Sequence, residues 1–203
     1  RDLARGLAAV HQHGILHRDL KSSNVMVTRP TGDEELTKLL DFGVAKAADL
    51  PEDEKMRITQ QGRFVGTPRY TAPEQIQGEE LTGRADIYAL GLLLWEAVVG
   101  EPAVPKVGFR ECCSYHLSDQ PWQLPDDVSC PGPLRDIIHR ALRKEPDDRF
   151  DSAAQMAERL DELLYALEAG SSKRPDQDDY SQWTQLLFGE LVAGGVGMLL
   201  GYP

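Results

Sequence analysis

The segment ILHRDLKSSNVMV, residues 15–27, places one Asp, one Lys and one Asn between two apolar runs. Asp19, Lys21 and Asn24 lie close together, and the chain then continues into the strand-like run NVMV. Because the apolar flanks favour burial, we expect these side chains to project from a loop that leads into a strand. A carboxylate, an amine and an amide at this spacing indicate a reactive site.

A further carboxylate follows in the next apolar run, LTKLLDFG at residues 36–43, where Asp41 ends a predicted strand. Asp19, Asn24 and Asp41 would all lie at strand or loop ends, so their oxygens can converge on one divalent cation and a hydroxyl nucleophile. Hard oxygen ligands suit Mg²⁺, with Mn²⁺ as an alternative. A proton-accepting carboxylate, a lysine beside it and a metal-binding pair suit phosphoryl transfer.

The bulk composition describes a soluble body with an acidic balance. The chain has 203 residues, 41% of them hydrophobic, and a formal net charge of −11, which argues for one domain with a tail and against a general nucleic-acid binder. It opens at Arg1 inside a helical pattern, so we expect a piece of a longer protein. The cysteines lack metal-ligand spacing and are expected to be reduced thiols in the cytosol: Cys112, Cys113 and Cys130.

Hydrophobic periodicity predicts a fold that is mainly α with a few short β-strands. The helix at 84–100 is apolar nearly all round and should be buried at the centre, whereas 101–133 is punctuated by Pro and Gly. Ser152 is the expected N-cap of the last helix. Helices are predicted at 1–14, 84–100, 134–146 and 152–167, and strands at 24–27 and 36–43.

Three ordered motifs resemble those of eukaryotic-type protein kinases. HRDLKSSN at 17–24, DFG at 41–43 and GTPRYTAPE at 66–74 are similar to the catalytic loop, the metal-binding loop and the end of the activation segment. RADIYALG follows, and the forms APEQ and DDRF look most like bacterial members. The resemblance covers residues 1 to about 168 and implies the large C-terminal lobe of a serine/threonine protein kinase.

This resemblance implies roles for the polar residues of the opening loop. Asp19 would be the catalytic base, and Lys21 would neutralise charge on the transferring phosphoryl group. Asn24 and Asp41 would hold Mg²⁺, and Met26 would lie under the adenine ring of ATP. Lys21 with Thr67 of the substrate loop resembles the serine/threonine branch, so the implied substrates are Ser or Thr hydroxyls of proteins.

Other positions match structural residues of the family. His17 and Phe42 would pack together to fix the metal loop, and Glu74 and Arg149 would form a buried ion pair. Asp86 matches a residue that accepts hydrogen bonds from the catalytic-loop backbone. A helix cap is the other reading of Asp86, and both roles can hold at once.

Counting hydroxyl side chains narrows the choice of residue for a regulatory phosphorylation site. Thr59 is the only hydroxyl side chain between Gly43 and Gly66. Arg18 and Lys46 resemble the basic pocket that captures a phosphorylated activation loop, so Thr59 is the hypothesised activating phosphosite. The alternative is an idle, solvated threonine of a surface loop.

The sequence departs from the family in what it lacks. No glycine-rich loop, strand lysine or partner glutamate precedes residue 15, so half of the nucleotide site would come from a small lobe that is missing here. We therefore expect little or no kinase activity from these 203 residues alone. The alternative function is a catalytically idle, kinase-like lobe that serves as a protein-binding module.

The C-terminal part is expected to lie outside the lobe. Residues 1–168 form the predicted lobe, 169–182 a linker by composition, and 183–203 an apolar segment. The apolar segment has the length and small-residue spacing of a membrane span, but Glu190 near its middle favours a helix that docks on protein. The expected location is a cytoplasmic lobe, with membrane anchoring through 183–203 as the open alternative.

Overall fold

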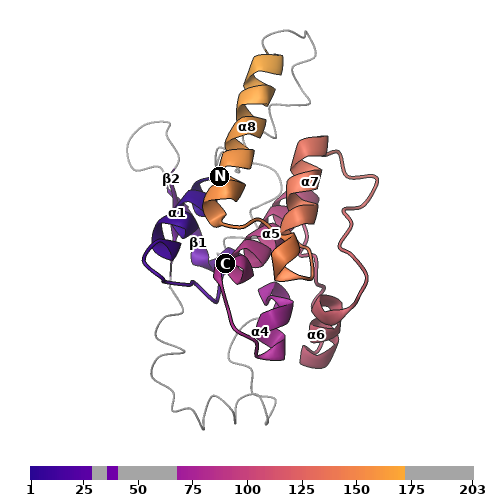
Figure 1. The fold of residues 1–203 in the computed structure, drawn as a ribbon. Helices are drawn as coiled ribbons and strands as arrows, with labels where there is room; N and C mark the ends of the chain where they lie inside the picture. Colours follow the sequence, from indigo (N-terminus) through magenta and orange to yellow (C-terminus); the bar gives the residue numbers. More distant parts are fainter. Residues whose placement is uncertain (29–35, 41–67, 172–203) are drawn as a thin grey trace.

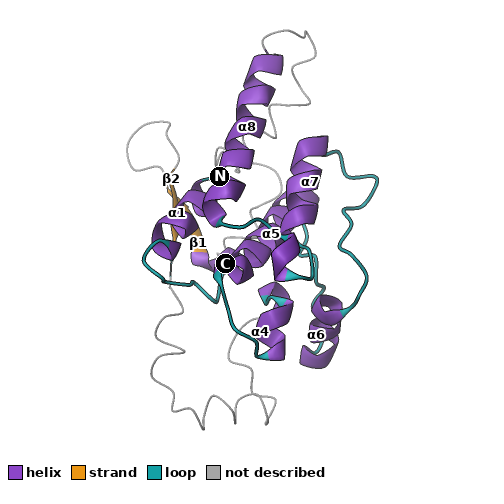
Figure 2. Cartoon of the chain, viewed as in Figure 1, coloured by secondary structure: helices purple, strands orange, loops and turns teal. Residues whose placement is uncertain are grey.

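Helices are the main secondary structure of the described part of the chain. The computed structural model describes residues 1–28, 36–40 and 68–171, and the helices in this part surround one long central helix (Figures 1 and 2). The predicted mainly α fold with a few short strands is therefore correct for these residues. The elements are α1 (Asp2–His11), η1 (Ser22–Asn24), β1 (Val25–Thr28), β2 (Leu36–Leu39), η2 (Pro68–Tyr70), α4 (Pro73–Gln77), α5 (Gly83–Val99), α6 (Phe109–Leu117), α7 (Gly132–Ala141), η3 (Pro146–Asp148) and α8 (Ala153–Ser171).

The two strands form a small antiparallel hairpin directly after the polar loop. Val25 pairs with Leu39, and Thr28 pairs with Leu36. The pairing continues one step beyond the strands, because the Leu40 backbone N–H donates to the carbonyl of Asn24 at 2.8 Å. This register brings the end of β2 beside the start of β1, and so beside the loop that carries Asp19 and Lys21.

The central helix α5 is buried along most of its length, as its apolar sequence predicts. Thr82 caps its N-terminus by accepting a hydrogen bond from the Arg84 N–H, and Gly100 ends it in the left-handed region at φ 83°. Helices α1, α7 and α8 pack against α5. At Gly91 the approach is close, because a Cβ there would lie 2.9 Å from the Cβ of Ala141 on α7.

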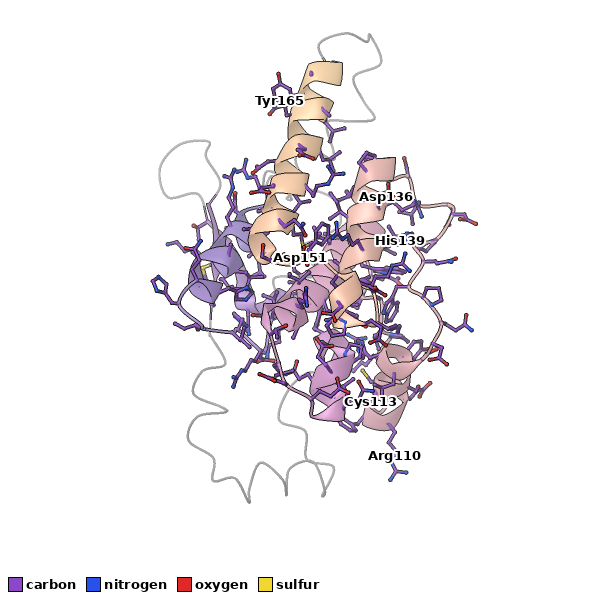
Figure 3. The ribbon with its side chains drawn as sticks, in the orientation of Figure 1. Arg110, Cys113, Asp136, His139, Asp151 and Tyr165 are labelled. Atoms are coloured by element: carbon purple, nitrogen blue, oxygen red, sulfur yellow. The ribbon has the colours of Figure 1, made fainter. Side chains whose placement is uncertain are left out.

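Helices α1 and α8 pack side by side and form a second layer (Figure 1). Helix α1 buries Ala4 and Leu7, and α8 buries an apolar stripe on the facing side. Ser152 caps α8, since its Oγ accepts the N–H of Gln155 at 3.1 Å. On the opposite side of α8, Tyr165 projects into solvent with an exposed fraction of 75% (Figure 3).

The boundaries differ from the predictions in several places. Helix α1 ends at His11 rather than near residue 14. Helix α6 lies inside 101–133, where no helix was predicted, and α7 ends at Ala141 rather than near residue 146. Helix α8 continues to Ser171, three residues past the predicted end of the lobe at 168. No helix among the described residues is long and apolar enough to cross a membrane, and 183–203 lies outside them.

Candidate active site

The predicted catalytic pair lies together on the loop between α1 and η1. Lys21 Nζ donates to Asp19 Oδ2 at 2.8 Å, and the two side chains are 20% and 16% exposed. This partial burial shields the pair from water and keeps both groups within reach of a molecule that approaches the loop. The lysine ammonium therefore lies where it can offset negative charge close to the carboxylate.

Asn24 closes the same loop from inside. Its side chain is buried, and its amide Nδ2 donates to the Asp19 carbonyl at 2.8 Å. Its backbone N–H donates to the Lys21 carbonyl at 3.0 Å, which forms the turn of η1. Since the amide nitrogen faces the backbone, the amide oxygen is the atom of Asn24 that suits a hard cation.

Asp86 holds the other side of the loop. One carboxylate accepts the His17 N–H at 2.8 Å on Oδ2 and the Arg18 N–H at 2.9 Å on Oδ1, and His11 Nε2 lies 2.8 Å from Oδ2. Asp86 lies in the first turn of α5 and is buried. The cap of α5 is Thr82, so the helix-cap reading of Asp86 is wrong.

The backbone at Arg18 is strained. Its φ of 63° is the only positive value outside glycine among the described residues. For an L-residue this conformation costs about 1–2 kcal/mol, so the surrounding contacts must stabilise it. Asp86 holds the N–H of Arg18, and Gln75 Nε2 of α4 donates to its carbonyl at 3.0 Å.

His17 connects the loop to β2. The imidazole is buried, and its Nε2 lies 3.1 Å from the carbonyl oxygen of Leu40. Leu40 directly precedes Asp41 in the sequence. The contact therefore ties the loop that carries Asp19 to the chain at the point where the predicted metal-binding motif begins.

A chain of hydroxyl groups links the loop to the substrate-loop motif. Burial, followed by the hydrogen bond to Glu96, raises the pKa of Tyr70 to about 12, so the phenol is protonated at neutral pH. Its O–H donates to Glu96 Oε2 at 2.5 Å. The phenol has only one proton, so Ser22 Oγ, 3.1 Å away, donates to the Tyr70 oxygen.

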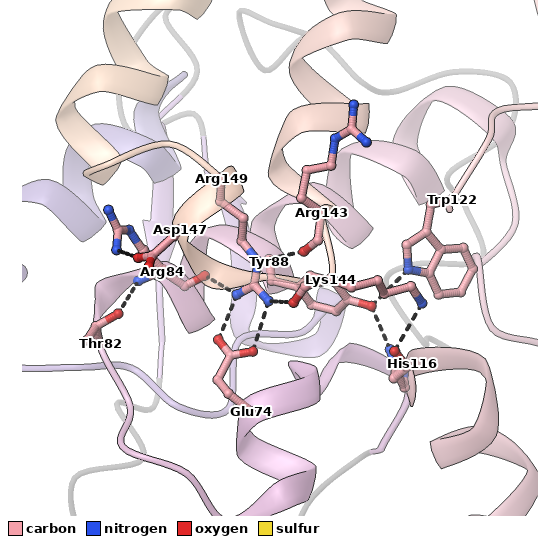
Figure 4. A network of polar contacts seen from close by, with 10 residues as sticks. All are labelled: Glu74, Thr82, Arg84, Tyr88, His116, Trp122, Arg143, Lys144, Asp147 and Arg149. Atoms are coloured by element: carbon pink, nitrogen blue, oxygen red, sulfur yellow. Dashed lines mark hydrogen bonds and ion pairs between the residues drawn. The ribbon is translucent and has the colours of Figure 1, made fainter. Parts of the chain in front are cut away.

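Glu74 and Arg149 form a buried ion pair (Figure 4). Arg149 Nη1 and Nη2 donate to the two carboxylate oxygens at 2.6 and 2.9 Å. The remaining N–H groups donate to the carbonyls of Arg84, Lys144 and Arg143, so all five donors of the guanidinium are used. The pair therefore joins α4 to α5 and to the turn before η3.

A second polar cluster lies beside this pair and joins α5 to α6 (Figure 4). Tyr88 OH lies 3.0 Å from His116 Nδ1, and Trp122 Nε1 donates to the same hydroxyl at 2.8 Å. Burial lowers the pKa of His116 to about 4. Lys144 Nζ donates to the carbonyls of Tyr115 and His116 at the end of α6, and burial, followed by repulsion from Arg149, lowers its pKa to about 8.

The structure thus brings one group of the predicted residues together and leaves another outside its described part. Asp19, Lys21, Asn24, Arg18 and His17 share the loop, and Met26 lies on β1 with 41% of its surface exposed. No group of three metal-ligating side chains occurs among the described residues. The predictions that lie outside them are Asp41, Phe42, Lys46, Thr59 and Thr67.

Sequence reasoning missed several residues that hold the loop. Gln75, Ser22 and Glu96 contact it directly or through Tyr70. Glu96 was detectable, because a carboxylate in a helix that is otherwise apolar must have a partner. Gln75 had no such signal, since a glutamine on a short surface helix is common.

The comparisons with known proteins agree with this geometry. The profile described as protein kinase domain matches residues 1–160. Over 158 residues the chain is 43% identical to the serine/threonine-protein kinase PkaA of Streptomyces coelicolor, covering 78% of this chain and 27% of that protein. It is 40% identical over 161 residues to PknD of Mycobacterium tuberculosis, covering 77% and 23%.

A third relative, Pkn1 of Myxococcus xanthus, is 38% identical over 159 residues, which are 78% of this chain and 22% of that protein. The chain therefore spans about a quarter of the length of these curated relatives. The match across most of the chain shows that it belongs to the protein kinase domain family.

Proposed function

We propose that the protein to which this chain belongs transfers the γ-phosphoryl group of ATP to Ser or Thr hydroxyls of protein substrates. The observation that carries the proposal is the 2.8 Å contact between Lys21 and Asp19 on a loop whose backbone is fixed from both sides. The names of the relatives support the serine/threonine specificity.

The loop residues supply positioning and charge in this mechanism. Asp19 orients the substrate hydroxyl and accepts its proton, while Lys21 neutralises charge that develops on the transferring phosphoryl group. Asn24 would hold Mg²⁺ through its amide oxygen, together with Asp41 outside the described residues. The cation, when bound, neutralises phosphate charge.

The nucleotide would lie against β1, where Met26 offers an exposed apolar surface next to the loop. We propose that residues 1–168 are the large lobe and that a small lobe elsewhere in the protein covers the nucleotide. The short share of each relative that the chain spans supports this division. The roles of 169–182 as a linker and of 183–203 as a docking or membrane-anchoring segment of a cytoplasmic lobe also remain proposals.

The decisive experiment replaces the proposed base in the complete gene product. Asp19→Asn keeps the shape of the side chain but removes its basicity, so we expect phosphate transfer from ATP to a Ser- or Thr-containing protein to fall roughly 10²- to 10⁴-fold. Asp148→Asn is the matched control, because Asp148 lies exposed on η3. Transfer of radiolabelled phosphate measures the rate.

Full activity of the Asp19→Asn variant would disprove the mechanism. If the unaltered complete protein also transfers no phosphate, the alternative function, an idle kinase-like lobe that binds a protein partner, replaces the proposal. The isolated 203 residues are expected to be nearly inactive, and measurable phosphorylation by them would contradict the division into lobes.

Regulation through Thr59 is part of the same proposal. Arg18 lies beside the proposed base, where its guanidinium can bind a phosphate on the activation segment. Lys46 and Thr59 lie outside the described residues. Phosphopeptide mapping of the active complete protein tests the site, and an unmodified Thr59 there would exclude it.

A further inference from the structure

The backbone of Arg18 needs support on both of its polar groups. This residue directly precedes Asp19 and adopts φ 63°, a conformation that L-residues rarely hold without help. Asp86 binds its N–H, and the N–H of Asp19, on the following peptide plane, donates to the His17 carbonyl at 2.9 Å. Neither contact holds the carbonyl of that plane, which is the Arg18 oxygen. The orientation of that plane sets the direction in which the Asp19 side chain projects.

Gln75 binds the carbonyl of that peptide plane. Its Nε2 donates to the Arg18 oxygen at 3.0 Å, across 57 residues of sequence. Gln75 is half-buried, whereas Arg18 and the hydrogen bond between them lie exposed at the surface. This contact joins Arg18, whose backbone is strained, to α4, which follows the predicted activation segment in the sequence.

The helix that carries Gln75 is itself firmly held. Glu74, the preceding residue, is bound to Arg149 in the buried ion pair. Neighbouring residues on a helix point about 100° apart, so one side chain can reach Arg149 while the next reaches the loop. Gly78 closes α4 in the left-handed region, and the Glu79 N–H donates to the Glu74 carbonyl at 2.9 Å.

The segment 68–77, which contains η2 and α4, contacts the loop at a second point, the hydrogen bond between Tyr70 and Ser22. Asp19 therefore lies between two attachments, Arg18 on one side and Ser22 on the other. This arrangement makes the position of residues 68–77 and the geometry of the catalytic loop depend on each other.

We propose that Gln75 is a positioning residue of the kinase, which fixes the Arg18–Asp19 peptide plane and thereby aims the Asp19 carboxylate. The proposal rests on the proposed function for its catalytic consequence, whereas its structural half stands on the contact itself. Gln75 touches neither substrate nor nucleotide in this role and acts only through Arg18.

Hydrogen exchange of the 203-residue chain tests the structural half. Gln75→Met removes the donor without adding charge, and Gln75→Glu removes it in a side chain of the same shape. Gln77→Met and Gln77→Glu make the same changes at an exposed position of the same helix. We expect the amides of Arg18 and Asp19 to exchange about fivefold faster in the Gln75 variants than in the Gln77 variants, the effect of one lost hydrogen bond.

Equal exchange in the Gln75 and Gln77 variants would overturn the proposal. Thermal unfolding of each variant shows whether it folds. Should one Gln75 variant fail to fold, the other is compared with its own Gln77 counterpart. Faster exchange throughout the chain, rather than at the loop, would also count against a positioning role.

Steady-state kinetics of the complete gene product test the catalytic half. We expect kcat per folded enzyme to fall roughly three- to tenfold in the Gln75 variants, with KM for ATP and for a Ser/Thr peptide unchanged, because the contact aims a group that acts in the transition state. An unchanged kcat would overturn the proposal. If the unaltered protein transfers no phosphate, the proposed function fails, and the exchange measurement still decides the structural half.

Discussion

At the scale of single residues, the loop that carries Asp19 depends on buried polar groups that each have a specific partner. Asp86 accepts two backbone N–H groups, and Tyr70 passes a hydrogen bond from Ser22 to Glu96. Such groups are expensive to bury alone but favourable once paired. The loop is therefore most sensitive to changes that remove one partner and leave the other in place.

Tyr70→Phe makes a change of that kind. It removes the hydroxyl that donates to Glu96 at 2.5 Å and leaves a buried carboxylate without that donor. We expect the free energy of unfolding to fall by about 2–3 kcal/mol, because a hydrogen bond to a charged group is lost and the charge stays desolvated. Urea unfolding of the two proteins at neutral pH measures the difference.

Ser22→Ala is the control for this pair. Ser22 only donates to the phenol from the half-buried loop, so its loss should lower the free energy of unfolding by roughly 1 kcal/mol or less. An equal loss in both variants would mean that Glu96 does not depend on Tyr70 for its stability.

Contacts between residues that are close in the sequence could be predicted, whereas contacts between distant residues could not. Asp19, Lys21 and Asn24 lie within a short stretch of sequence, so their proximity follows from the sequence itself. Gln75 reaches Arg18 across 57 residues of sequence, and Asp86, which holds the loop, is contacted by His11 across 75 residues. Those contacts are created by helix packing, which no local pattern reports.

At the scale of elements, composition decides which helices can be predicted. Helix α5 is apolar nearly all round and has clear end signals in Thr82 and Gly100, so its position was predicted to within one residue at each end. Helix α6, FRECCSYHL, buries two cysteines and a histidine rather than an apolar stripe. Its end is bound by Lys144, which lies far along the chain, and it was missed for these reasons.

The contact of α5 with α7 depends on the missing side chain of Gly91. A Cβ there would lie 2.9 Å from the Ala141 Cβ and 3.0 Å from Leu142 Cδ2. We expect Gly91→Ala to lower the free energy of unfolding by about 1–3 kcal/mol, because a well-packed core must move to make room. Thermal or urea unfolding measures the change.

Gly6→Ala supplies the matched comparison on α1. Gly6 is exposed, and a Cβ there has no atom of the described residues within 4 Å. The same substitution should therefore raise the free energy of unfolding by roughly 0.5–1 kcal/mol, through the lower entropy of the unfolded chain. Effects of the same sign at the two sites would contradict the close packing of α5 on α7.

At the scale of the whole molecule, helices α5 and α6 are joined through titratable groups. His116 of α6 lies against Tyr88 of α5, beside the ring of Trp122 and the carbonyl of Pro68, with the Lys144 ammonium nearby. Burial holds the His116 pKa near 4, below its ordinary value of 6.5, so the folded protein keeps this imidazole neutral. Unfolding releases it to water, where it takes up a proton more readily.

The pH dependence of stability follows from this difference. Between pH 6.5 and 4 the unfolded chain binds more protons than the folded one at His116, so stability is lost as the pH falls through this window. We expect the free energy of unfolding to fall by about 2 kcal/mol from this residue between roughly pH 7 and pH 5. Urea unfolding at the two pH values measures the loss.

His116→Gln separates this residue from the other titrating groups. Glutamine can still hydrogen-bond to Tyr88 but does not titrate, so the variant should lose about 2 kcal/mol less than the unaltered protein over the same interval. His139 of α7, whose pKa is also lowered, chiefly by burial, contributes a loss of the same sign to both proteins and cancels in the comparison. An equal loss in the two proteins would show that α6 does not bury a neutral histidine against α5. The cluster around His116 and Tyr88 (Figure 4) would then not be what lowers the stability of the protein at acidic pH.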